Sequence, residues 1–197
     1  DYLNDLLKTD NEDYVVASDT DSIYVVFDKL VDKVFKEEQD SSRVVPFLDT
    51  VAREKIEPFI NKSYEDLHQY VNSYEQKMEM SREVIADKGI WTAKKRYILN
   101  VHDNEGVKYK EPQLKIMGIE AVKSSTPEPC REKIKEGLKI IMNGTEKELN
   151  TFIQDFREEF MTLPPEDIAY PRSVNGLSKF SDSNQLFAKG APIHCKG

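Results

Sequence analysis

The sequence predicts an α+β fold, in which a β-hairpin and further antiparallel strands lie beside one long helix and are followed by a mostly helical part. Three observations lead to this prediction. Two apolar, β-prone runs flank a short polar tip at residues 19–22, the pattern of a β-hairpin. Apolar residues then recur at helical spacing between about residues 45 and 74. Beyond residue 125, two amphipathic segments each begin with a helix-capping signal.

The composition is that of an ordinary globular protein. The 197 residues are 39% hydrophobic and 32% charged, which suits one or two domains rather than a disordered or fibrous chain. No apolar run approaches the length of a membrane span, and the first residues lack a signal-peptide pattern. Cys130 and Cys195 lie far apart, without metal-ligand spacing. They indicate reduced thiols, so we expect a cytoplasmic protein.

The first elements along the chain are a helix end and the hairpin. Residues 1–10 look like the end of a helix whose beginning is missing, and nothing caps its start. This predicts that the chain begins inside a larger protein. Residues 14–18 and 23–27 form the two hairpin strands. Both runs are almost continuously apolar, so we expect the hairpin to be covered on more than one side.

The long helix and several strands come next. Pro46 suits the first turn of the helix, and Pro58 should kink or split it. We expect strands at residues 77–86 and 91–101, and then a turn at residues 103–106. A short strand near residues 107–110 and an extended segment over residues 114–123 should follow.

The second part should be helical. Thr126 with Pro127 suits an N-cap and first helical position, and the helix should end at residues 143–144. Thr145 with Glu148 forms a capping box for the next helix, which residues 164–165 should end. The last thirty residues look irregular. We therefore expect two units, residues 1–122 and 123–197.

Charge is distributed unevenly. The net charge of −8 argues, taken alone, against a nucleic-acid partner. Residues 88–123, however, contain eight Lys or Arg and four Asp or Glu, which gives this stretch +4 and the remainder −12. Such a strip can bind phosphate locally, because charges are screened over about 10 Å. From charge alone, a solvated sheet face remains the favoured interpretation.

The pair Asp19 and Asp21 at the hairpin tip is the most informative feature. Two carboxylates one residue apart repel each other and lose hydration beside apolar strands, so both gain from a cation. Mg²⁺ suits one or two protein carboxylates together with phosphate oxygens. A solvated turn is the plain alternative. A third hypothesis is the D-x-D element of nucleotide-sugar glycosyltransferases, although these enzymes place a long nucleotide-binding region first and only 18 residues precede Asp19.

Several segments together resemble family B DNA polymerases. Residues 18–25 (SDTDSIYV) are similar to motif C, and residues 92–97 (TAKKRY) resemble the KKRY motif. Residues 114–120 with residues 123–127 resemble the palm-to-thumb passage of polymerases from T-even-type phages. Residues 190–194 (GAPIH) resemble a thumb segment of that group more weakly. These matches keep the family's order. The resemblance implies a palm portion over residues 1–122 and a thumb portion over residues 123–197.

The resemblance also implies roles around the metals. Asp21 matches the motif C aspartate that ligates the catalytic ions, and Asp19 matches its supporting neighbour. Glu83 falls where relatives place another acidic residue near the metals. Ser81 stands where related phage sequences tend to have Asp, which departs from the pattern. On charge alone, Glu83 would be a surface residue.

A further set of residues is implied to bind DNA. Lys95 and Tyr97 match the element that holds the primer terminus. On a single strand, residues two apart share a face, so both side chains could reach one nucleotide. Minor-groove acceptors look alike for correct pairs, so a lysine there senses pairing geometry rather than sequence. Lys94 and Arg96 would then point the other way. The alternative is an exposed basic strand with Tyr97 in the core.

Three more residues, Lys123, Ser124 and Ser125, precede the expected helix start. A lysine, hydroxyls and a helix N-terminus can cradle a phosphate. The alternative is that they only form the loop that leads into the helix.

The implied parent activity is template-directed nucleotidyl transfer in phage DNA replication in the host cytoplasm, with two Mg²⁺ ions, primer-template DNA and deoxynucleoside triphosphates. No motif A-like or motif B-like run occurs in the sequence. We therefore expect this segment to be inactive alone and to need a polypeptide that supplies both. A non-catalytic DNA-binding or complementing subunit of a split polymerase is the alternative.

Overall fold

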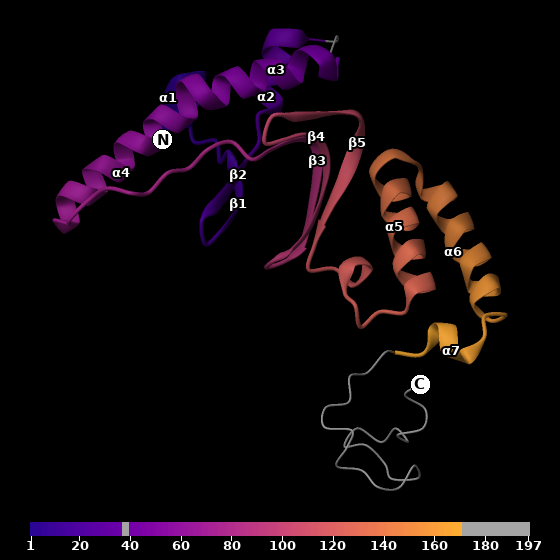
Figure 1. Cartoon of the computed structure of the whole chain (residues 1–197). Coiled ribbons are helices and arrows are strands. Elements are labelled where there is room, and N and C mark those ends of the chain that lie inside the picture. The colour runs from indigo at the N-terminus through magenta and orange to yellow at the C-terminus, as the bar shows by residue number, and fades with distance from the viewer. Residues whose placement is uncertain (37–39, 171–197) are drawn as a thin grey trace, which may run out of the picture. The chain divides into compact units, whose positions relative to one another are not determined.

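The computed structural model describes residues 1–36 and 40–170, which form helices with one two-stranded and one three-stranded antiparallel sheet (Figure 1). This arrangement confirms the predicted α+β class. The chain divides into two compact units, Asp1–Met117 and Gly118–Gly197. The assignment of residues 1–122 to a palm and 123–197 to a thumb stays a prediction. Residues 190–194 and Cys195 lie outside the described residues.

The first unit begins with helix α1 (Tyr2–Leu7), strands β1 (Val15–Asp19) and β2 (Ser22–Val25), and helix α2 (Asp28–Phe35), which the sequence did not predict. The hairpin is confirmed, but its expected cover is not. Val15, Val16 and Ile23 are 42%, 49% and 40% exposed. Within the described residues, β1 and β2 pair only with each other, so no third strand shields these side chains.

A long, interrupted helix follows. Helix α3 (Ser41–Val51) continues through a π-helical turn (Ala52–Ile56) into α4 (Glu57–Val71). The expected place of Pro46 in the first turn was wrong. The helix begins at Ser41, after an N-cap at Asp40 whose carboxylate accepts from the Ser42 N–H, so Pro46 lies inside the helix. Pro58 has no N–H to donate to the carbonyl four residues before it. The π-helical turn ends at Ile56, two residues before Pro58, so the predicted disturbance of the helix is present.

The three-stranded sheet has the order β3-β4-β5, with strands β3 (Val84–Ala93), β4 (Arg96–Asn104) and β5 (Val107–Met117). The strand expected at residues 77–86 begins later, and the short strand and extended segment expected after residue 107 form one long strand. Ile98, Leu99 and Val101 of the central strand are at most 4% exposed. The core of this unit therefore sits on β4.

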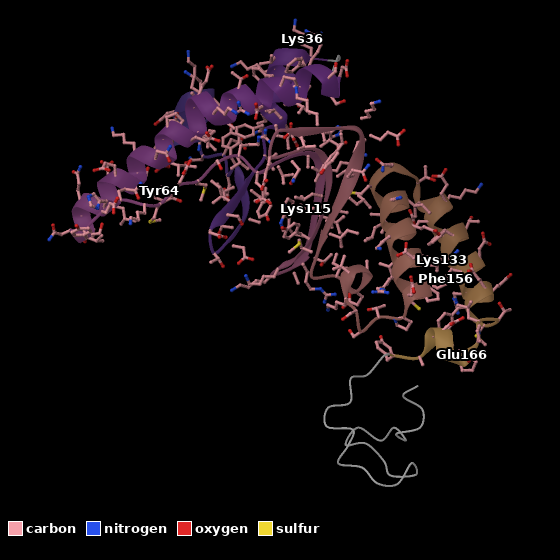
Figure 2. All side chains as sticks on the ribbon, in the orientation of Figure 1. Lys36, Tyr64, Lys115, Lys133, Phe156 and Glu166 are labelled. Atoms are coloured by element: carbon pink, nitrogen blue, oxygen red, sulfur yellow. The ribbon has the colours of Figure 1, made fainter. Side chains whose placement is uncertain are left out.

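The second unit is helical in its described part. A 3₁₀ turn (Glu120–Val122) leads to α5 (Glu128–Asn143), α6 (Glu146–Phe160) and α7 (Pro165–Ile168). The capping box is confirmed, since the Thr145 hydroxyl accepts from the Glu148 N–H and the Glu148 carboxylate accepts from the Thr145 N–H. Between the helices, Lys133 lies 5.8 Å from the Phe156 ring centroid and is labelled beside it in Figure 2.

The start of α5 differs from the prediction. Thr126 was expected to be the N-cap, but Pro127 occupies that position with an extended backbone and the helix begins at Glu128. Thr126 is instead buried, and its N–H closes a turn onto the Lys123 carbonyl at 3.0 Å. Among the described residues, no helix is both long enough and apolar enough to cross a membrane.

Candidate active site

The acidic hairpin tip is built by a tight turn between β1 and β2. Asp19 pairs with Ser22 across the strands, so Thr20 and Asp21 form the connection. The Thr20 hydroxyl donates to the Asp19 carboxylate at 3.1 Å, and the Ser22 hydroxyl donates to the Asp19 carbonyl at 3.1 Å. Thr20 has a φ of 53°, which is uncommon for a β-branched residue. Such conformations persist where neighbouring contacts enforce them, often at functional sites.

A basic hairpin tip meets the acidic one. The turn between β3 and β4 is Lys94-Lys95, and the Lys95 ammonium donates to both oxygens of the Asp19 carboxylate at 2.7 and 2.9 Å. The hydrogen bond from Lys95 is the largest cause that holds the pKa of Asp19 below its usual range. Asp21 is exposed, and its carboxylate makes no hydrogen bond or ion pair within residues 1–36 and 40–170.

The turn position corrects the argument that Lys95 and Tyr97 share one strand face. Ala93 pairs with Arg96, so the chain reverses direction at Lys94-Lys95. Of the four residues of the KKRY match, Arg96 and Tyr97 lie on β4 and the two lysines form the turn. Lys95 has a φ of 61°, in the left-handed region that suits a two-residue turn. Lys95 therefore projects from a hairpin tip, where its side chain is 62% exposed although it donates to Asp19. Lys94 is exposed at the same tip.

Tyr97 belongs to a cluster of three aromatic rings. Its centroid lies 5.3 Å from that of Tyr24 and 6.3 Å from that of Trp91, and Tyr24 and Trp91 meet edge to face at 5.3 Å. Burial is the largest cause that raises the pKa of Tyr97, followed by its hydrogen bond with Tyr24 and the negative charges of Glu83 and Asp19. The Tyr97 phenol is therefore a neutral hydrogen-bond donor at physiological pH.

Glu83 lies immediately before β3, at the end of that strand opposite the Lys94-Lys95 turn. Its carboxylate is ion-paired with Lys115, which projects from β5 and is labelled in Figure 2. Glu83 and Asp19 both act electrostatically on Tyr97. Asp21, Glu83 and Lys115 also line one open cavity of about 1170 Å³ in the first unit.

The acidic residues of the described chain do not form a complete metal site by themselves. In the described portions of the chain, no three Asp, Glu, His or Cys side chains come together closely enough to hold a metal ion. The hairpin tip offers hard oxygen ligands of the kind Mg²⁺ accepts, but Asp19 and Glu83 are each occupied by a lysine. These residues fit one side of a divalent-metal centre and need further oxygen ligands to complete it.

The three residues expected to cradle a phosphate lie in the second unit. Lys123, Ser124 and Ser125 are exposed in the turn before α5. The Lys123 ammonium forms an ion pair with Glu120 at 3.1 Å. Because Thr126 does not cap the helix, these residues stand one residue further from the first helical N–H groups than the sequence suggested.

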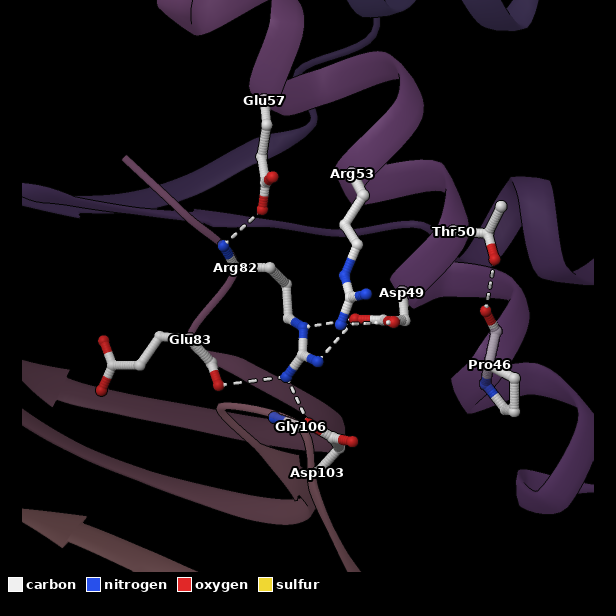
Figure 3. Close-up of polar contacts among 9 residues, drawn as sticks. All are labelled: Pro46, Asp49, Thr50, Arg53, Glu57, Arg82, Glu83, Asp103 and Gly106. Carbon is white, nitrogen blue, oxygen red and sulfur yellow. Dashed lines mark hydrogen bonds and ion pairs between the residues drawn. The ribbon is translucent and has the colours of Figure 1, made fainter. Parts of the chain in front are cut away.

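Sequence reasoning missed Tyr24, Trp91, Lys115 and Arg82. Tyr24 lies within the match to motif C and Trp91 directly precedes the match to the KKRY motif, so both aromatic residues were an available signal. Arg82 precedes Glu83, and its guanidinium contacts Asp49 and Asp103 (Figure 3). Burial lowers the pKa of Arg82, but the hydrogen bonds with Asp49 and Asp103 outweigh it and raise the pKa overall.

Two known proteins are similar to the whole of this chain. The DNA-directed DNA polymerase of Enterobacteria phage T4 is 38% identical over 208 residues, and that of Escherichia phage RB69 is 40% identical over 205 residues. Each comparison covers 100% of this chain and 23% of the relative, so the chain spans less than a quarter of their length. No protein-family profile matches the chain.

Proposed function

We propose that this chain, which is homologous over its whole length to a segment of the DNA polymerases of T-even-type phages, forms part of the catalytic region of a template-directed DNA polymerase. Residues 1–122 would belong to the palm and residues 123–197 to the thumb. The observation that carries the proposal is the meeting of an acidic tip, a basic tip and the Tyr97 phenol within one unit.

The acidic tip would hold the reacting groups. Asp21, which is exposed and without a contact in the described residues, is the principal ligand in this proposal, with Asp19 beside it and Glu83 at the margin of the site. Two Mg²⁺ ions bound there would neutralise the charge that develops as a primer 3′-hydroxyl attacks a deoxynucleoside triphosphate. The carboxylates fix where that charge is balanced, and catalysis depends on alignment and electrostatics rather than on a covalent intermediate.

The basic tip and the tyrosine would hold the primer end. The neutral Tyr97 hydroxyl would exchange its hydrogen bond with Tyr24 for one to a minor-groove acceptor of the primer end. Lys95 is 62% exposed on its side chain and can leave Asp19 for DNA when a metal ion takes its place. Lys94 and Arg96 would contact the backbone nearby, and Lys123, Ser124 and Ser125 would contact phosphates from the thumb.

Because the chain supplies only part of the metal ligands, the proposal includes a second polypeptide part. It would carry the missing carboxylate and the basic helix that grips the triphosphate. We call this chain, when it is joined to or mixed with that part, the assembled polymerase. Phage replication takes place in the bacterial cytoplasm, and we propose this location for the protein as well.

The test is primer extension by the assembled polymerase with Asp21→Asn. We expect the rate to fall at least about 100-fold, because loss of one metal-ligating carboxylate removes several kcal/mol of charge stabilisation. Asp66→Asn on the exposed face of α4 is the matched control and should extend primers normally. An Asp21→Asn variant that extends primers at the wild-type rate would overturn the proposal.

A second candidate is a complementing subunit that binds DNA without catalysing its extension. The ion pairs of Asp19 with Lys95 and of Glu83 with Lys115 favour it, because both carboxylates already have a cationic partner. It predicts that this chain binds primer-template DNA and that Asp21→Asn leaves extension by the assembled polymerase unchanged. The nucleotide-sugar hypothesis gains no support from the relatives, which are both DNA polymerases.

A further inference from the structure

Arg82 is an enclosed charged group that the proposed reaction does not use. Its side chain is 9% exposed, and its guanidinium lies between the long helix and the sheet (Figure 3). Nε donates to Asp49 at 2.9 Å, and Nη2 pairs with the same carboxylate. Nη1 pairs with Asp103, whose side chain is 2% exposed. A planar, forked donor is the one side chain that can satisfy two carboxylates in this way.

The π-helical turn places two helix acids around Arg82. In a continuous α-helix, residues eight positions apart are offset by about 80° around the axis. A π-helical turn accommodates one extra residue and so rotates the following helix backward. Asp49 lies before the turn and Glu57 after it, and both reach Arg82, Asp49 through the guanidinium and Glu57 through the Arg82 N–H at 2.8 Å. The π-helical turn therefore brings both carboxylates toward the same face of the helix, where Arg82 lies.

These contacts converge on the backbone of Glu83. The Glu83 carbonyl accepts from Arg82 Nη1 at 3.3 Å and from the Glu105 N–H at 2.6 Å. The Asp103 carboxylate also accepts from the Gly106 N–H at 2.9 Å, which fixes the turn between β4 and β5 that contains Glu105. The Glu83 backbone is therefore held from two sides, whereas its side chain is 54% exposed and pairs with Lys115 on the sheet.

We propose that Arg82 is a positioning residue that holds Glu83 at the margin of the metal site, so that its carboxylate acts together with the hairpin-tip aspartates. The inference rests on the function proposed above. Arg82 touches neither the substrate nor the ions in this arrangement and acts through the Glu83 backbone. Placement matters because a catalytic group displaced by about 1 Å can lose roughly 100-fold in rate.

The variant that tests this role is Arg82→Lys in the assembled polymerase. A single ammonium keeps the positive charge near Asp103 but cannot also bond Asp49 and the Glu83 carbonyl. We expect the Mg²⁺ concentration for half-maximal extension to rise about 10-fold, as is typical when a residue supporting a metal ligand is lost. The KM for the deoxynucleoside triphosphate, measured at saturating Mg²⁺, should change much less.

Two control variants separate positioning from stability. Arg53→Ala removes the other partner of Asp49, an ion pair at 3.1 Å whose arginine side chain is 61% exposed. Val45→Ala destabilises the same helix at a buried position without touching the guanidinium. Both should leave the Mg²⁺ dependence unchanged. Val45→Ala and Arg82→Lys are compared at temperatures that lie equally far below their own melting temperatures, so that both are equally close to unfolding.

A double-mutant cycle and direct metal binding complete the test. In a Glu83→Gln background, Arg82→Lys should cause little further change in Mg²⁺ dependence, because Arg82 acts on the metal site by positioning Glu83. Electron paramagnetic resonance should show weaker Mn²⁺ binding to Arg82→Lys than to the wild type. Full additivity with Glu83→Gln, or an equal shift in Val45→Ala, would overturn the inference.

The failure of the proposed function has a different signature. A wild-type assembly that does not extend primers would count against the polymerase proposal itself. Mn²⁺ binding then decides the positioning role alone, and equal binding by the wild type and Arg82→Lys would overturn it.

Discussion

Two contacts between a cation and carboxylates lie at opposite ends of the three-stranded sheet. At the β3–β4 turn, Lys95 binds Asp19 with side chains that are 62% and 27% exposed. At the other end, Arg82 binds Asp103 with side chains that are 9% and 2% exposed. Water can replace either partner in the first contact but not in the second. The exposed contact can therefore exchange its partners, whereas the buried contact is held in place.

The difference follows from how each contact is built. Lys95 stands on a two-residue turn and has one flexible side chain, so an exposed pair of this kind adds little to stability. Arg82 is enclosed between a helix and a sheet, where an unpaired charge is costly. We expect losses of stability to divide in the same way, with a large loss at the buried end and a small one at the exposed end.

The largest effect should come from removing the acidic partner at the buried end. Asp103→Ala leaves Arg82 with one carboxylate fewer and the Gly106 N–H without its acceptor. Breaking a buried pair in this way costs about 3 to 5 kcal/mol, which urea unfolding should measure as a lower midpoint with an unchanged slope. Asp19→Ala is the matched substitution at the exposed end and should leave the midpoint almost unchanged. Equal losses at the two ends would remove the distinction.

A smaller effect should come from the sheet between the two ends. A Cβ at Gly89 would lie 2.7 Å from the Trp91 ring and 2.9 Å from Leu99, so Gly89→Ala must displace the ring that packs on Tyr24. We expect a loss of about 1 to 3 kcal/mol. A shift in fluorescence should accompany it, since Trp91 is the one tryptophan of the chain. Unchanged fluorescence would mean that the aromatic cluster tolerates the methyl group.

Local signals explain what the sequence could predict. The hairpin, the long helix and the Thr145–Glu148 capping box each depend on residues close together in the chain, and all three are present. The strand boundaries were less accurate. The turn at Lys94-Lys95 contains no Gly, Pro, Asn or Asp to mark it, so the motif was interpreted as one continuous strand.

Contacts between distant residues explain what the sequence could not predict. Lys95 meets Asp19 across 76 residues, and Arg82 meets Asp49 and Asp103 across 33 and 21 residues. Such contacts depend on strand register and helix packing, which no local pattern encodes. A family resemblance located Asp19 and Lys95 separately, but only the fold brings them together as one exchangeable pair.

The smallest effect concerns the pKa of Asp19. The hydrogen bond from the Lys95 ammonium is the largest cause that holds this pKa below its usual range. A depressed pKa in the folded state stabilises the fold above the unfolded-state pKa, and this contribution is lost as the pH falls through the folded-state value. Lys95→Met should therefore raise the pKa of Asp19 toward its ordinary value, as followed by carboxyl-carbon NMR.

The neighbouring lysine provides the control for that titration. Lys94 acts on Asp19 only through weaker, longer-range attraction, so Lys94→Met should raise the pKa of Asp19 less than Lys95→Met does. Added salt should reduce the effect of Lys94 more strongly, because screening weakens distant charges before direct hydrogen bonds. Equal shifts in the two variants would mean that the basic tip acts as diffuse charge. A larger shift for Lys95→Met would mean that the direct hydrogen bond of one ammonium dominates the electrostatics of the carboxylate.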